Sequence, residues 1–118
     1  MDQAGERRYR LTGVGAYDAL FADGRRRDGD FLQLLFLPAR LASGRVGYAI
    51  PKKVLALAVD RNRIRRVLRE AVRAARPPVC EYDVVLRLKR GCPRADARLV
   101  AADARRLLAG LSGDGKRP

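Results

Sequence analysis

The chain has 118 residues, 47% of them hydrophobic, and its 26 lysines and arginines against 13 aspartates and glutamates give a formal net charge of +13. This length fits one domain with a real core rather than two, and so small and basic a body repels itself unless a polyanion binds it. Nucleic acid is the leading partner and an anionic membrane surface the second, while the absence of histidine excludes Ser-His and Cys-His nucleophiles.

The first segments predict an arm and a short helix. Residues Met1 to Arg10 are charged and lack periodicity, which is typical of a flexible arm rather than a signal peptide. A helix follows, capped by Thr12 and ended by Gly24 ahead of the basic run Arg25–Arg27. No apolar stretch approaches the roughly 20 residues of a membrane-spanning helix, so we expect a soluble, cytoplasmic protein.

Two apolar segments predict a β-hairpin. Phe31 to Leu37 is too short for a convincing helix and is closed by Pro38, so it predicts a mostly buried strand. Arg45 to Ile50 alternates apolar and other residues, and a polar turn around Ser43 precedes it. The second segment is therefore expected to pair with the first.

The long helix predicted from Arg61 to Arg76 has two opposite faces. Its apolar residues share one arc of about 140°, the core face. They are Ile64, Val67, Leu68, Ala71, Val72 and Ala75. The other side is basic and is interrupted by one acid, Glu70. It consists of Arg61, Asn62, Arg63, Arg65, Arg66, Arg69, Arg73 and Arg76.

This arginine crowding favours an anionic ligand. Like charges at i and i+4 destabilise a helix, and arginines in the first turn oppose the helix dipole, so a bound phosphate would relieve both. The alternative is that the arginines pair with acids elsewhere in the chain. Asn62 can either hydrogen-bond RNA or satisfy neighbouring backbone groups.

The last third of the chain predicts one strand and one helix. Tyr82 to Lys89 is the strand, Arg94 to Leu111 is an amphipathic helix, and Gly113 to Pro118 is a polar tail. Cys80 and Cys92 form no CxxC motif and, without histidine, no Cys/His zinc site, so two reduced thiols are expected. The element order implies one α/β or α+β sandwich domain over residues 1–118, with an ordered body at about 10–111.

The stretch from Lys52 to Glu70, with Arg-Asn-Arg at 61–63, closely resembles the signature of the bacterial ribonuclease P protein subunit. Further matches follow the family's order: Arg10-Leu11, Tyr17 with Phe21, Arg45-Val46-Gly47 and Tyr82-Asp83-Val84-Val85. The resemblance implies an αβββαβα two-layer sandwich with a central mixed sheet, resembling a small-subunit ribosomal protein domain. It also implies a left-handed βαβ crossover, which the general rule of right-handed crossovers would not predict.

The same resemblance implies a function. Ribonuclease P removes the 5′ leader of precursor tRNA, and its active site, with Mg²⁺, is expected in the catalytic RNA. No catalytic or metal-binding residue is therefore expected in the protein, whose partners would be ribonuclease P RNA and precursor tRNA. The residues expected to bind the catalytic RNA are Arg61, Asn62, Arg63, Arg65, Arg66, Arg69 and Arg73.

A second surface is expected to bind the single-stranded leader. Tyr17 and Phe21 lie one helical turn apart, so their rings could stack on unpaired bases, although spacing alone fits ordinary core anchors equally well. The resemblance favours the leader cleft. The predicted leader-binding residues are Tyr17, Phe21, Arg45, Lys52, Lys53, Arg87 and Lys89.

The sequence departs from the family pattern at three places. Tyr17 stands where phenylalanine is more usual, which should preserve stacking, and Leu34 stands where some members have an aromatic strand residue. We therefore expect one stacking ring fewer. The connector from Val54 to Asp60 lacks the glycine of some members and is more apolar than the family pattern.

Two other functions are compatible with the composition. A protein-only nuclease needs several convergent carboxylates, whereas acids such as Asp18, Asp83 and Asp103 are scattered along the chain. A ribosomal or general RNA-binding module would also be basic, and composition cannot separate it from a tRNA-processing subunit.

Overall fold

The computed structural model describes residues 14–39, 44–75, 81–91 and 97–115, without the side chains of 14–17 and 112–115. Its elements, in chain order, are α2 (Val14–Asp23), β1 (Arg25–Asp28), β2 (Leu32–Pro38), β3 (Val46–Ala49), α3 (Ala58–Ala74), β4 (Tyr82–Leu88) and α4 (Ala97–Gly115). This is the expected αβββαβα order. The predictions for the N-terminal arm, Thr12, Ser43, Cys80 and Cys92 lie outside the described residues.

The four strands form one mixed sheet in the order β1-β2-β4-β3. Strand β2 pairs antiparallel with both β1 and β4, and β3 pairs parallel with β4. The two central strands are the most apolar, and their residues are buried on both faces of the sheet. A nearly continuous apolar run is the pattern expected of a strand covered on both sides, so β2 and β4 occupy the centre.

The predicted hairpin between Phe31–Leu37 and Arg45–Ile50 is wrong. Strand β3 does not pair with β2; it lies beyond β4 at the edge of the sheet. The strand that precedes β2 in the chain, β1, is the one that forms a hairpin with it. In this segment the sequence predicted only a basic run after the first helix. Three consecutive arginines lack the alternation that reveals a strand, and an edge strand can carry them because its side chains reach solvent.

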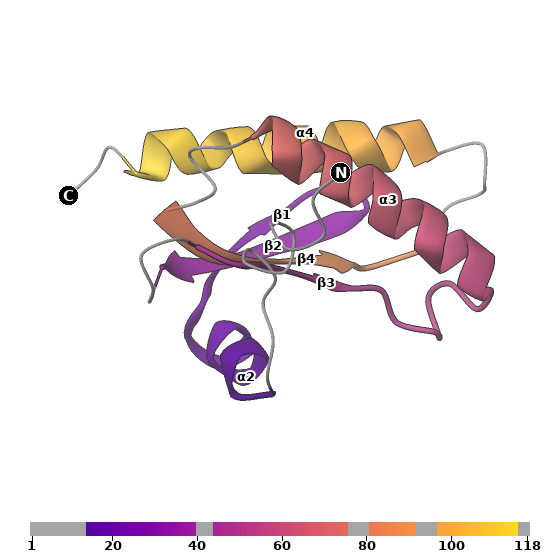
Figure 1. The fold of residues 1–118 in the computed structure, drawn as a ribbon, viewed down its shortest axis with the longest axis horizontal. Coiled ribbons are helices and arrows are strands. Elements are labelled where there is room, and N and C mark those ends of the chain that lie inside the picture. The colour runs from indigo at the N-terminus through magenta and orange to yellow at the C-terminus, as the bar shows by residue number, and fades with distance from the viewer. Residues whose placement is uncertain (1–13, 40–43, 76–80, 92–96, 116–118) are drawn as a thin grey trace.

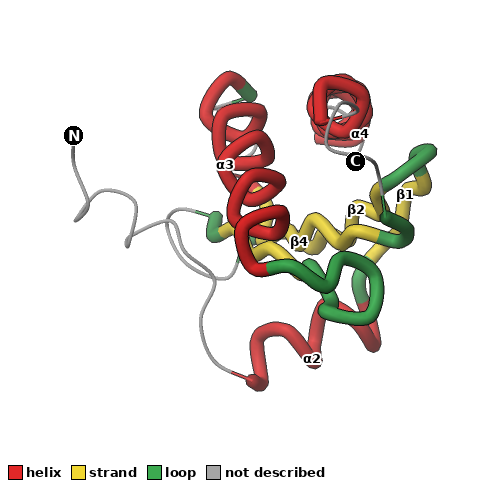
Figure 2. Tube along the Cα trace, turned by 90° about the vertical axis from the view of Figure 1, so that its right-hand side faces the viewer, coloured by secondary structure: helices red, strands yellow, loops and turns green. Residues whose placement is uncertain are grey.

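Helices cover the two faces of the sheet unequally. Helices α3 and α4 lie on one face and α2 on the other (Figures 1 and 2). The larger core lies under α3 and α4 and includes Leu34, Leu86, Leu68 and Leu108. The smaller core is made by Leu20, Leu35 and Val85, on the side of α2.

Helix α3 connects the parallel strands β3 and β4 by a left-handed crossover. Figure 1 shows both strands running in the same direction with α3 returning above them, and Figure 2 shows α3 and α4 side by side over the sheet. Seen from the helix side with the strands pointing up, β4 lies to the left of β3. This is the unusual hand that the family resemblance implied.

The amphipathic predictions for α3 and α4 are confirmed. Ile64, Leu68, Ala71 and Val72 of α3 are buried, and so are the five residues of α4 that face the sheet. Those five are Val100, Ala104, Leu107, Leu108 and Leu111. Neither of these helices, nor any other in the described ranges, has the length and apolar character needed to cross a membrane.

The predicted ends of these helices need correction. Helix α3 begins at Ala58, three residues before the predicted Arg61, because the extended Leu57 (φ −83°, ψ 131°) forms its N-cap. Helix α4 continues to Gly115, so part of the predicted polar tail is helical. Polar and glycine residues weaken a helix without forbidding another turn, which is why composition misplaced this end.

A buried carboxylate ties α4 to the turn between β1 and β2. Asp103 is 4% exposed, and its two carboxylate oxygens accept hydrogen bonds from the backbone N–H groups of Asp30, Phe31 and Leu32 at 3.1, 3.0 and 3.0 Å. The turn comes so close that a Cβ on Gly29 would lie 2.3 Å from Asp103 Oδ1. Only glycine fits there, and the contact fixes α4 along the sheet.

Replacing Asp103 with alanine is expected to lower the free energy of unfolding by about 2–4 kcal/mol, because buried amides lose a charged acceptor. Asp103→Asn keeps one acceptor oxygen, so its free energy of unfolding should lie between those of the unchanged protein and Asp103→Ala. The exposed Asp28→Ala serves as control and should cost less than about 1 kcal/mol. Urea denaturation followed by circular dichroism measures all three, and equal midpoints for Asp103→Ala and Asp28→Ala would contradict this role.

Candidate nucleic-acid interface

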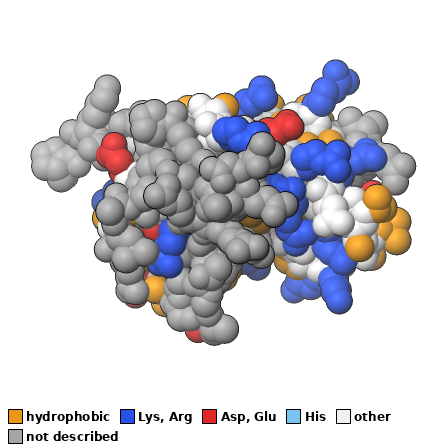
Figure 3. All heavy atoms as spheres, viewed as in Figure 1, with side chains coloured by type: hydrophobic (Ala, Val, Ile, Leu, Met, Phe, Trp, Pro, Cys, Tyr) orange, Lys and Arg blue, Asp and Glu red, His pale blue; other side chains and the backbone are white. Residues whose placement is uncertain are grey.

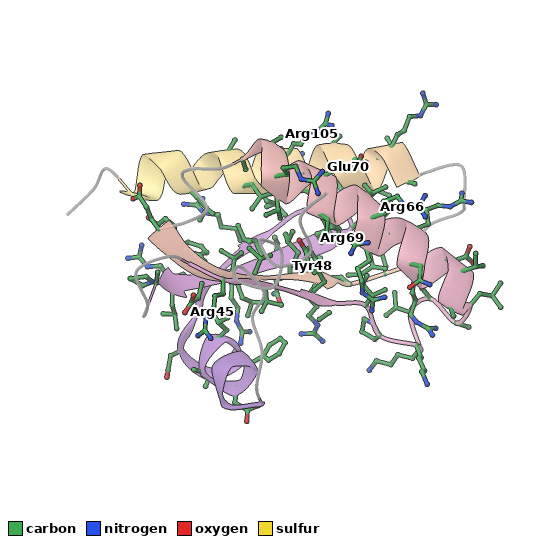
Figure 4. All side chains as sticks on the ribbon, viewed as in Figure 1. Arg45, Tyr48, Arg66, Arg69, Glu70 and Arg105 are labelled. Atoms are coloured by element: carbon green, nitrogen blue, oxygen red, sulfur yellow. The ribbon has the colours of Figure 1, made fainter. Side chains whose placement is uncertain are left out.

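The side of α3 that faces away from the sheet is almost entirely basic. Four of its residues are exposed and recur at i, i+4, i+7 and i+11, within an arc of about 60°. This α3 outer face consists of Asn62, Arg66, Arg69 and Arg73. Arginine and lysine side chains crowd over α3 with little acidic surface among them (Figure 3), and Arg66 and Arg69 are labelled on it in Figure 4.

Three other predicted residues of α3 are only half-exposed, and two of them are held by the protein itself. Arg61 Nη1 donates hydrogen bonds to the carbonyl oxygens of Leu55 and Ala56, at 3.0 and 2.6 Å. Arg65 Nη1 donates to Asn62 Oδ1 at 3.1 Å, so the Asn62 side chain is partly occupied in orienting an arginine. Arg63 is half-buried beside them. The two hydrogen bonds of Arg61 therefore hold the connector before α3 against the first turn of the helix.

Three described acids are engaged away from the α3 outer face. Asp83 is 5% exposed and accepts the backbone N–H of Arg45 at 2.9 Å, and Asp103 binds the β1–β2 turn. Asp28 pairs with Lys89 at 3.3 Å. Within the described part of α3, Glu70 is the one acid exposed beside the outer face. The charges of Arg66 and Arg69 therefore reach solvent on this face.

The second predicted surface lies on the α2 side of the sheet. Phe21 is half-exposed against the smaller core, and the guanidinium carbon of Arg87 lies 5.9 Å from the centre of its ring. This distance is within the range of a cation–π contact. Gln33 of β2 lies directly opposite Arg87 of β4, and the Gln33 side-chain amide donates a hydrogen bond to Asp28 Oδ1 at 3.2 Å. The structure thus brings an aromatic ring, an arginine and an amide together.

Three predicted lysines border this surface. Lys89 follows the end of β4, two residues after Arg87, and Lys52 and Lys53 are exposed in the turn after β3. That turn lies beside the end of β4, because a Cβ on Gly91 would come within 2.8 Å of the Val54 carbonyl oxygen. The parallel strands β3 and β4 therefore end together, and their basic residues gather at one edge of the sheet.

One predicted leader residue, Arg45, is not in this group, and another, Tyr17, cannot be assigned to it from the described side chains. Arg45 comes four residues before Ala49, the residue paired with Arg87, which places it about 13 Å back along the strand. Its guanidinium faces Asp83, with Arg45 Nη2 3.8 Å from Asp83 Oδ2, and the side chain is 19% exposed. The side chain of Tyr17 lies outside the described residues. Leu34 is fully buried in the larger core, on the other side of the sheet from Phe21.

Sequence reasoning missed Gln33 as part of this surface. It is the one polar residue inside the apolar run from Phe31 to Leu37, and the alternation of strand side chains places such a residue on the less covered face. That signal was present in the sequence. Its pairing with Arg87 was not, because the neighbour of β2 depends on the order of the strands.

Comparison with known proteins decides the family. The model of the ribonuclease P protein family, described as "Ribonuclease P", matches residues 6–112, which is most of the chain. The chain belongs to the ribonuclease P family. Its fold agrees, since it superposes on the ribonuclease P proteins of Staphylococcus aureus and Thermotoga maritima with a TM-score of 0.67 for each, at 16% and 19% identity. These superpositions cover 92% and 84% of this chain and 95% and 94% of those chains.

Curated bacterial relatives of this ribonuclease P family chain cover nearly its whole length. It is 34% identical over 100 residues to the ribonuclease P protein component of Aromatoleum aromaticum, covering 85% of this chain and 84% of the relative. It is 35% identical over 112 residues to that of Thioalkalivibrio sulfidiphilus, covering 95% and 93%. The two candidate surfaces both lie within the matched region.

Arg61 and Arg66 should behave differently although both were predicted to bind RNA. Arg61→Ala removes two hydrogen bonds to the connector and should lower the free energy of unfolding by roughly 1–2 kcal/mol. Arg66→Ala should change it by less than about 0.5 kcal/mol, because no described residue pairs with this side chain. Chemical denaturation of the purified variants measures both values. Equal stability of the two variants would show that the Arg61 contacts contribute nothing.

Proposed function

We propose that this chain is the protein subunit of a ribonucleoprotein ribonuclease P and that its α3 outer face binds the catalytic RNA. The observation that carries the proposal is the exposure of Arg66, Arg69 and Arg73 on a helix whose opposite side is buried, in a chain of this family. Guanidinium groups bind phosphate strongly and with defined geometry. The relatives named as ribonuclease P protein components support the same assignment.

The second part of the proposal concerns the substrate. We assign the surface of Phe21, Arg87, Lys89, Lys52 and Lys53 to the single-stranded 5′ leader of precursor tRNA. An aromatic ring can stack on any base, and the surrounding cations can follow the phosphates, so binding would not require a particular leader sequence. Gln33 can add a hydrogen bond to a base edge or sugar.

The chemistry of cleavage is assigned to the RNA. Mg²⁺ bound there would supply the activated water and stabilise the leaving group. Three described carboxylates support that division, because Asp83 and Asp103 are buried in structural contacts and Asp28 is engaged by Lys89. The protein then contributes binding and positioning, and we place this activity in the cytoplasm.

Reconstitution tests the proposed function. The full chain is added to a bacterial ribonuclease P RNA at a magnesium concentration too low for the RNA alone to act, and cleavage of precursor tRNA is measured. We expect the protein to restore cleavage at the mature 5′ end. No gain with the protein would contradict the assignment as a ribonuclease P subunit, and cleavage by the protein without RNA would contradict the placing of catalysis in RNA.

A paired variant sharpens this experiment. Arg66→Ala with Arg69→Ala removes two exposed charges and should weaken binding to the ribonuclease P RNA. The slope of log affinity against log salt should decrease by about 1.5, because fewer counterions are released. Unchanged affinity and slope would show that the α3 outer face does not contact the RNA.

Phe21→Leu tests the leader surface. Leucine still fills the smaller core but cannot stack, so affinity for precursor tRNA with a single-stranded leader should fall by about 1–3 kcal/mol. Affinity for mature tRNA should stay the same. Phe31→Leu is the matched control, since the Phe31 ring packs on the larger core under Arg90. Equal losses for precursor and mature tRNA, measured on the reconstituted holoenzyme, would remove Phe21 from the leader site.

A further inference from the structure

The outer side of α4 repeats the spacing of the α3 outer face on a second helix. Four exposed residues recur at i, i+4, i+7 and i+11 and fall within an arc of about 60°. This α4 outer face consists of Arg98, Ala102, Arg105 and Ala109. Arginines and alanines alternate along it. The two arginines are separated by one alanine, and the small alanine side chains project little from the helix.

The two outer faces lie on neighbouring helices. Helices α3 and α4 pack beside each other on one face of the sheet (Figures 1 and 2), and each turns its buried stripe towards the strands. Their exposed stripes therefore both point away from the sheet. Figure 4 shows Arg105 on α4 and Glu70 on α3 on the side of the molecule remote from α2, with Arg66 and Arg69 lower on α3, towards the sheet in this view.

No described acid neutralises the α4 outer face. Arg98 and Arg105 are exposed and form no ion pair or hydrogen bond with another described side chain. Arg106, one position further round the helix, behaves differently: its Nη2 contacts Oδ1 of the buried Asp103 at 2.5 Å and lies 4.0 Å from Asp30 Oδ2. The fold therefore uses Arg106 and leaves the other two arginines directed at solvent.

The spacing of these arginines suits an extended polyanion. Arg98 and Arg105 are seven residues apart, or about 10.5 Å along the helix axis. Ala102 and Ala109 leave the backbone of α4 accessible, so a phosphate chain can approach both guanidinium groups without displacing a bulky side chain. A helix face of this kind, placed beside another basic face, forms one broad positive surface rather than a single stripe.

We propose that the α4 outer face is a second contact for RNA phosphates and that one RNA lies across both α3 and α4. The proposal rests on the proposed function, because the RNA is the same ribonuclease P RNA that the α3 outer face binds. It extends the contact from one helix to two. The arginines of α4 would contribute affinity and fix the orientation of the protein on the RNA rather than read its sequence.

Ala102→Glu tests this proposal with opposite effects on folding and binding. A carboxylate at this position lies one turn from both Arg98 and Arg105, so it should maintain or raise the stability of α4. The same carboxylate would repel phosphate and neutralise its neighbours, and affinity for the ribonuclease P RNA should fall about five-fold or more at roughly 0.1 M salt. Ala102→Gln has nearly the same size without charge and should bind within about two-fold of the parent.

Arg98→Ala with Arg105→Ala provides the second arm, expected to decrease the salt-dependence slope by about 1.5. Urea denaturation is run on every variant, so that a loss of binding is attributed to folded protein. Parent-like binding by Ala102→Glu and by the double variant would overturn the proposal, and so would equal weakening by Ala102→Glu and Ala102→Gln. The Arg66→Ala, Arg69→Ala variant separates the α4 contact from the proposed function. If this variant loses affinity for the RNA while the α4 variants do not, only the α4 contact is contradicted. If it too binds normally, the proposed function is contradicted.

Discussion

The contact between the apolar stripe of α3 and the sheet determines how this protein presents its charge. Ile64, Leu68, Ala71 and Val72 are buried against the strands, which fixes the rotation of the helix about its own axis. With that rotation set, the residues at i, i+4, i+7 and i+11 on the other side must face solvent. The arginines therefore need no partner to orient them. Their self-repulsion is balanced by the apolar contact beneath them, which is much less sensitive to salt.

The distribution of acids completes this arrangement. Asp83 and Asp103 are nearly buried, and each accepts hydrogen bonds from backbone N–H groups of a different part of the chain. Using carboxylates as backbone acceptors removes negative charge from the surface and at the same time joins elements that are distant in sequence. A chain with few acids thus gains both specificity of folding and a surface whose positive potential is little reduced.

Local patterns predicted much of the fold and of the candidate interface. The two faces of α3, the apolar arc of α4 and the alternation in β4 follow from side-chain periodicity, and the structure confirms them. Periodicity could not predict which strands are neighbours in the sheet. The pairing of β3 with β4 depends on the connection through α3, which periodicity does not describe. Likewise, the sequence places Arg61 on the basic side, but its hydrogen bonds to Leu55 and Ala56 depend on how the connector turns. The left-handed crossover came from the family resemblance and not from a physical rule.

Strand β1 forms one edge of the described sheet. As an edge strand it offers a row of backbone donors and acceptors to which a strand from another molecule could add. Its sequence is Arg-Arg-Arg-Asp, so each such addition would bring several guanidinium groups of two molecules together and strip water from them. The three arginines of β1 therefore protect this edge of the sheet against pairing with a second copy of the chain.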